Sequence, residues 1–177
     1  MSGFMQALPF TLRMEGGYSN HEADPGGATM KGVTQAVYDS WRRDSGLAVR
    51  TVREITDDEL EAIYWSRYWT PAKCEALPWP ASMCHFDAAV NHGTAGAARI
   101  LQRAVGVAVD GKIGPQTLAA AATLPTPVLV ARMLFERLAY YERIMLANKG
   151  LRVFALGWLS RVNALRAACR TDMPEVA

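Results

Sequence analysis

What this sequence has little of excludes several classes of protein. No apolar run approaches the ~18 residues that a membrane-spanning helix needs. Lysine and arginine (19) nearly balance aspartate and glutamate (17), and the net charge of +2 is far below that of a nucleic-acid-binding protein. Glycine (14) and proline (9) occur at ordinary levels, which argues against a disordered chain. We therefore expect a globular protein with no nucleic-acid partner and no stable membrane insertion.

Cysteine is also scarce, with only Cys74, Cys84 and Cys169 in 177 residues. The N-terminus lacks the basic and apolar regions of a secretory signal peptide. An odd number of cysteines without such a signal favours free, buried thiols in a reducing compartment. A Cys74–Cys84 disulfide is the alternative if the protein ends up outside the cytoplasm. No histidine or cysteine has HExxH or CxxC spacing, so neither a metal site nor a cofactor is predicted.

The pattern of apolar residues indicates a mainly α protein. Half of the residues are apolar, which at this length suits one globular domain or a catalytic lobe with a small addition. Apolar positions recur at helical spacing over most of the chain. Residues 18–34 break that periodicity and contain the turn sequence Asp24-Pro25-Gly26-Gly27. We expect a small β-hairpin there, after the first helix, and a helical C-terminal lobe.

Capping residues and glycines mark where the helices should begin and end. Thr34 and Thr56 have the positions of N-caps, and Thr56 forms a capping box with Glu59. Gly16-Gly17 should end the first helix, and Gly93 should separate two others. These signals give helices over 2–15, 34–46, 81–92, 94–105, 126–148 and 152–170. The last of these is expected to turn five apolar residues inward: Phe154, Leu156, Leu159, Val162 and Leu165.

Glu15 is the first candidate for a catalytic residue, because it ends a helix and is followed at once by two glycines. The C-terminal end of a helix carries a partial negative charge, and Met14 and Tyr18 offer apolar cover. Both effects favour the protonated carboxyl group near neutral pH. Such a group can protonate the departing oxygen of a glycosidic bond. A solvated glutamate at a helix end is the structural alternative.

Among the polar residues that follow Glu15 in the same segment, three are candidates to act with it: Asp24, Thr29 and Thr34. If this segment folds back as a hairpin, they can face Glu15 across a cleft. An aspartate could stabilise positive charge that develops on a sugar or activate a water molecule, and a threonine hydroxyl could hold that water. An Asx-turn is the structural alternative for Asp24, and the N-cap is the alternative for Thr34.

Residues further along the chain offer further contacts to a sugar. Asn91 could bind hydroxyl and acetamido groups through its amide, or cap the helix ahead of Gly93. Four aromatic residues could stack on sugar rings or pack in the core: Tyr64, Trp65, Tyr68 and Trp69. No GxSxG or phosphate-binding loop is present.

The motif EGGYxxxxxDPGGATxxGVT, residues 15–34, resembles the signature of glycoside hydrolase family 108, muramidases found mostly in phage endolysins. The segments FDAAVNHGTAGAARILQ, 86–102, and VDGKIGPQTLAAA, 109–121, are similar to the C-terminal part of the same proteins, which is commonly described as a peptidoglycan-binding region. The resemblance implies a lysozyme-like α+β fold. It also implies a catalytic lobe over 1–93 and a helical, peptidoglycan-binding lobe over 94–177 packed on it.

The activity that this resemblance implies is hydrolysis of the β-1,4 bond between N-acetylmuramic acid and N-acetylglucosamine in bacterial peptidoglycan. Glu15 matches the catalytic glutamate of the family and would be the general acid. Asp24 and Thr34 lie in the shared motif and complete the catalytic set, with Thr29 as a rival to Thr34. No metal or organic cofactor is needed.

Substrate contacts are assigned to Tyr18, Thr29 and Asn91. Two other activities stay open. A lytic transglycosylase would cleave the same bond without water, and a non-enzymatic protein that binds the cell wall would share the fold. An endolysin would wait as a monomer in the host cytoplasm until a holin releases it to the periplasm or cell wall.

Overall fold

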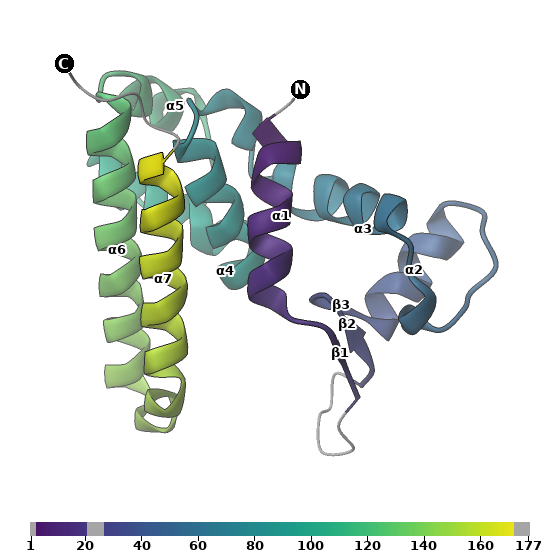
Figure 1. Cartoon of the computed structure of the whole chain (residues 1–177). Coiled ribbons are helices and arrows are strands. Elements are labelled where there is room, and N and C mark those ends of the chain that lie inside the picture. Colours follow the sequence, from purple (N-terminus) through teal and green to yellow (C-terminus); the bar gives the residue numbers. More distant parts are fainter. Residues whose placement is uncertain (1–2, 21–26, 172–177) are drawn as a thin grey trace. The chain divides into compact units, whose positions relative to one another are not determined.

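The computed structural model describes residues 3–20 and 27–171, which form two compact units (Figure 1). One unit comprises residues 8–67, and the other comprises residues 3–7 with 68–171. Within the described ranges, no helix is both long and apolar enough to cross a membrane. The helices are α1 (Gly3–Glu15), α2 (Gln35–Asp44), α3 (Asp57–Tyr64), α4 (Ala81–Val105), α5 (Pro115–Ala122), α6 (Thr126–Ala147) and α7 (Ala155–Thr171).

A small antiparallel sheet follows α1, so the predicted mainly α fold with a β excursion after the first helix is confirmed. Its three strands are β1 (Tyr18–Ser19), β2 (Thr29–Met30) and β3 (Val33–Thr34), and they pair in the order β1-β2-β3. Thr29 of β2 lies opposite Thr34 of β3, and Tyr18 of β1 lies opposite Met30 of β2. Val33 is buried and anchors the sheet.

Both predicted N-caps are confirmed. The Thr34 hydroxyl accepts a hydrogen bond from the Val37 amide at the start of α2, over 3.3 Å. At the start of α3, the Glu59 amide donates to the Thr56 hydroxyl and the Thr56 amide donates to the Glu59 carboxylate. Each cap satisfies a backbone amide that would otherwise lack a partner in the first turn.

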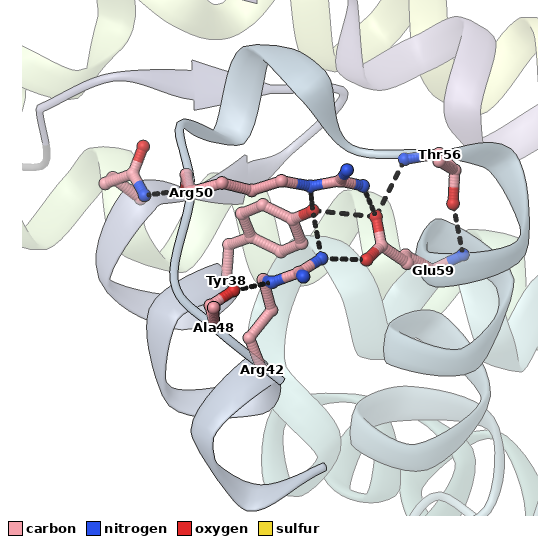
Figure 2. Close-up of polar contacts among 7 residues, drawn as sticks. Tyr38, Arg42, Ala48, Arg50, Thr56 and Glu59 are labelled. Carbon is pink, nitrogen blue, oxygen red and sulfur yellow. Dashed lines mark hydrogen bonds and ion pairs between the residues drawn. The ribbon is translucent and has the colours of Figure 1, made fainter. Parts of the chain in front are cut away.

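The Glu59 carboxylate also joins α2 to α3 (Figure 2). It accepts hydrogen bonds from the Tyr38 hydroxyl and from Arg50 Nη2, both over 2.7 Å, and forms an ion pair with Arg42. Partial burial disfavours the charged form, but the hydrogen bonds from Thr56, Tyr38 and Arg50 outweigh it. They lower the pKa of Glu59 to about 2. One carboxylate therefore fixes two helices and the loop that precedes α3.

The other unit is built around α4, which packs on α6 and, with α6, on α7 (Figure 1). Gly93 lies inside α4 with φ 72° and ψ 161°, so the predicted break between two helices is confirmed as a kink. The rings of Phe4, Trp69 and Phe86 pack edge to face, with centroids 5.5 to 5.6 Å apart. Trp69 is thus a core residue of this unit.

A buried ion triad ties these three helices together. Asp87 of α4 is fully buried and pairs with Arg137 of α6 at 2.6 Å and with Arg161 of α7 at 2.8 Å. Burial alone would raise the pKa of Asp87, but the two guanidinium groups outweigh it and the pKa lies below its ordinary value. Loss of the carboxylate would leave two arginines in the core without their shared partner.

The expectation that all five apolar residues of the last helix face inward is wrong for three of them. Phe154 (54% exposed), Leu156 (82%) and Leu159 (47%) face solvent, whereas Val162 and Leu165 are buried. The helix begins at Ala155, after a short 3₁₀ segment, Lys149–Phe154, that connects it to α6. The ends of α6 and α7 near this connection extend past α4 (Figure 1).

Replacing Asp87 by alanine should destabilise the chain by about 3–5 kcal/mol, because it leaves uncompensated charge in the core. Chemical denaturation followed by circular dichroism measures this loss. Glu142→Ala is the control, since Glu142 is an exposed carboxylate on α6, and its loss should change the free energy of unfolding by less than about 0.5 kcal/mol. Equal effects of the two substitutions would contradict the role given to the triad.

Acid should remove the contribution of Glu59 to stability over a defined pH range. Because its pKa is depressed from 4.5 to about 2 on folding, this contribution is fully present above pH 4.5 and is lost as the pH falls toward 2. Unfolding free energies measured between these pH values should converge for the wild type and Glu59→Gln. A constant difference between the two proteins would show that Glu59 does not titrate as described.

Candidate functional site

Glu15 is the last residue of α1, and the chain leaves the helix directly after it. Gly16 has φ +79°, the left-handed conformation that commonly follows a helix end. The carboxyl oxygen Oε1 of Glu15 is inaccessible to solvent, although the residue as a whole is half-buried. The helix thus ends with an acid whose side chain lies partly inside the smaller unit.

The turn between β2 and β3 forms the surface against which this carboxyl group packs. Lys31 (φ 47°) and Gly32 (φ 78°) both have positive φ, as in the type I′ turns that join two-residue hairpins. A Cβ atom built on Gly32 would lie 2.9 Å from Glu15 Oε2 and 2.6 Å from the Tyr64 hydroxyl oxygen. Any side chain at residue 32 would therefore collide with both groups.

Tyr64 is the other polar group at this turn, and it comes from the end of α3. Its ring is buried, and its hydroxyl donates a hydrogen bond to the Lys31 carbonyl oxygen over 2.7 Å. Because α3 is capped by Thr56 and held by Glu59, the position of this hydroxyl is fixed by the rest of the smaller unit. From the sequence, Tyr64 is expected only to pack in the core or to stack on a sugar ring. Its spacing with other aromatic residues does not predict a hydrogen bond to Lys31, which lies 33 residues earlier in the chain.

Thr29 and Thr34 lie directly opposite each other on β2 and β3, so their side chains share one face of the sheet. Thr34 accepts the capping hydrogen bond described above, and the Thr29 hydroxyl donates to the Gly27 carbonyl oxygen over 3.4 Å. Both residues are half-buried. The hairpin thus places side by side Thr29 and Thr34, the two candidates for the threonine that holds the water molecule.

Tyr18 lies on β1, where its ring is 41% exposed. The Arg53 guanidinium lies 5.0 Å from the ring centroid, a cation–π contact that orients the aromatic plane. Lys31, in the turn between β2 and β3, forms an ion pair with Asp57 over 3.2 Å. Asp24, the remaining residue of the predicted catalytic set, lies outside the described residues.

Asn91 belongs to the other unit. Its side-chain oxygen accepts hydrogen bonds from the Tyr141 hydroxyl, over 2.7 Å, and from Arg137, over 3.4 Å, although the residue is exposed overall. The Tyr141 ring stacks on Trp158 with centroids 4.6 Å apart. Asn91 is therefore tied to the network around Asp87, and its contact with substrate stays a prediction.

The described residues contain no group of three or more His, Cys, Asp or Glu side chains that could hold a metal ion. His85 is fully buried, and its Nε2 atom lies 3.1 Å from the Ala72 carbonyl oxygen. Burial lowers the pKa of His85 to about 4, so the ring is neutral at physiological pH. It fills a place in the core of the larger unit.

Comparisons with known proteins match nearly the whole chain. Residues 8–93 match the family described as glycosyl hydrolase 108, and residues 96–163 match a predicted peptidoglycan domain. The chain is similar to a solved structure of SagA from Brucella abortus, with 33% sequence identity and a TM-score of 0.79. The match covers 96% of this chain and 94% of that one. This likeness confirms the expected lysozyme-like fold. Comparison with curated proteins gives no match.

Gly32→Ala should lower the rate of peptidoglycan solubilisation by about 100-fold, because the new methyl group would displace the Glu15 carboxyl group or the Tyr64 hydroxyl by about 1 Å. It should also cost about 1 kcal/mol of stability, since residue 32 has positive φ. Turbidity of a peptidoglycan suspension and thermal denaturation measure the two effects.

Gly46→Ala is the matched control for this substitution. Gly46 has φ +70°, and a Cβ atom there would meet nothing within 4 Å. We expect the same small loss of stability with unchanged activity. Equal activity losses in both variants would show that backbone strain alone, and not contact with Glu15 and Tyr64, explains the Gly32 effect.

Proposed function

The chain belongs to the glycosyl hydrolase 108 family and is a glycoside hydrolase that acts on peptidoglycan, and we propose that it is an N-acetylmuramidase with Glu15 as its general acid. The bond cleaved is the β-1,4 bond between N-acetylmuramic acid and N-acetylglucosamine. The observation that carries the proposal is the packing of the Glu15 carboxyl group against Gly32, beside the Tyr64 hydroxyl. This contact lies inside the segment that matches the hydrolase family.

A general acid must present its proton to the glycosidic oxygen in a fixed orientation. Two features support this role for Glu15. The side chain leaves the last residue of a helix, so its backbone is rigid. It also packs against a turn to which the Tyr64 hydroxyl is hydrogen-bonded. A glutamate on an open helix surface would lack the second constraint.

Water that attacks the sugar would be positioned by the hairpin. A threonine hydroxyl has one proton to donate and two lone pairs to accept. Thr34 can therefore serve as N-cap through one lone pair and still bind a water molecule. Thr29, opposite it on the sheet, offers a second hydroxyl, and Asp24 would activate the water or support the developing positive charge. Attack from the face opposite Glu15 would invert the anomeric carbon.

Substrate contacts are proposed for Tyr18, Thr29 and Asn91. The Tyr18 ring is 41% exposed and held in place by Arg53, so a sugar ring could stack on its open part. The match of residues 96–163 to a predicted peptidoglycan domain supports a second region of contact with the polymer. In the cell, we propose an endolysin that acts as a monomer. It would stay in the host cytoplasm until a holin releases it to the periplasm or cell wall.

Glu15→Gln should lower the rate of muropeptide release from purified peptidoglycan by at least ~100-fold, because the amide cannot donate the acidic proton. The folded structure should be unaffected, since glutamine has nearly the same shape. Chromatography and mass spectrometry of the soluble products measure the rate, and circular dichroism checks the fold.

Glu54→Gln is the control, because Glu54 is an exposed glutamate of the same unit. It should release muropeptides at the wild-type rate. If Glu15→Gln stays as active as this control, Glu15 is not the acid. If both variants and the wild type release only free peptides, the chain cleaves a different bond.

A further inference from the structure

Two of the three cysteines meet inside the larger unit. The Sγ atoms of Cys84, in the first turn of α4, and Cys169, near the end of α7, lie 3.2 Å apart. Both side chains are buried and both thiols are free. Cys74, which the sequence offered as a partner for Cys84, is buried and free as well. The contact found in the folded chain is therefore Cys84–Cys169, whereas the sequence suggested Cys74–Cys84.

We propose that Cys84 and Cys169 are a disulfide-forming pair, oxidised by a small-molecule or protein disulfide when the protein leaves a reducing compartment. Sulfur atoms in a disulfide are about 2.0 Å apart. Bond formation thus requires an approach of about 1 Å, which a small side-chain rotation can supply. The pair joins positions 85 residues apart, and the bond would fasten the C-terminal helix to the helix at the centre of the unit.

Both thiols are almost fully buried, with 3% of Cys84 and 1% of Cys169 exposed, and the thiol that we assign as the first to meet the oxidant is Cys169. It lines a surface pocket of about 250 Å³ between α6 and α7, together with Arg166 and Arg170. The two arginines in its lining would attract an anionic oxidant such as glutathione disulfide. Cys84 does not line this pocket. Its hydrogen bond with Cys169 and its burial raise the pKa of the Cys84 thiol, which makes it unreactive toward external reagents.

The chemistry is two successive thiol–disulfide exchanges. The Cys169 sulfur, after losing its proton, attacks glutathione disulfide, forms a mixed disulfide and releases one glutathione thiolate. The Cys84 sulfur, also deprotonated, then attacks the Cys169 sulfur and releases the second glutathione. The two protons pass to the released thiolates. The protein loses two hydrogen atoms, and one glutathione disulfide is reduced to two thiols.

The disulfide should stabilise the chain, because a cross-link over a long loop restricts the unfolded state. For a protein of this size we expect oxidation to raise Tm by roughly 10 °C. The effect should be reversed by dithiothreitol. This stabilisation needs no change in the site around Glu15. It can therefore be tested without an activity assay.

The test incubates the reduced full-length protein with glutathione disulfide, both folded and during refolding from denaturant. The protein is then denatured, its free thiols are alkylated, and it is digested and mapped by mass spectrometry. We expect a peptide pair linked through Cys84 and Cys169, alkylated Cys74, and the increase in Tm. Cys74→Ser should give the same linked peptide pair and the same increase in Tm on oxidation as the wild type.

Two single variants test the order of the steps. In Cys84→Ser, Cys169 should accumulate as a mixed disulfide with glutathione, whereas Cys169→Ser should leave Cys84 unmodified in the folded protein. Three alkylated cysteines in the refolded wild type, or a linkage that includes Cys74, would overturn the proposal. Because the readout is peptide mass, such a failure is distinct from any failure of the proposed muramidase activity.

Discussion

Gly32 is the residue on which the geometry around Glu15 depends. Its positive φ lets the chain reverse between two very short strands, and its missing side chain leaves room for two polar groups. The Glu15 carboxyl group occupies one part of that space and the Tyr64 hydroxyl occupies another. The same absence of a Cβ atom therefore makes the turn and brings together the end of α1 and the end of α3.

The charged groups of each unit hold the helices that carry its candidate site residues. In the smaller unit, Glu59 connects α2, α3 and the loop between them, and α3 carries Tyr64 to the turn. In the larger unit, Asp87 holds two arginines in the core, and Arg137 also contacts Asn91. Each cluster uses one carboxylate with several donors, which is the arrangement that makes partly or fully buried charge tolerable.

Local signals in the sequence predicted much of this fold. The caps at Thr34 and Thr56 and the break at Gly93 each depend on a few neighbouring residues, so the sequence shows them directly. The motif that makes Glu15 the candidate acid is also a short segment of neighbouring residues. Tyr64 was missed because its partner lies 33 residues away, and an aromatic residue on a helix usually indicates core packing. The Cys84–Cys169 contact and the exposure of Leu156 depend on how α4, α6 and α7 pack, which periodicity does not determine.

The most direct test of the central claim is to digest purified peptidoglycan in water enriched in heavy oxygen and to analyse the muropeptides by mass spectrometry. The proposed mechanism predicts products that end in reducing N-acetylmuramic acid and carry one heavy oxygen at that end, with their peptides intact. Anhydro-muramic ends without the label would mean a transglycosylase, and label at a reducing N-acetylglucosamine or in free peptides would mean a different bond. Either result would contradict the proposal that Glu15 serves a water-dependent muramidase.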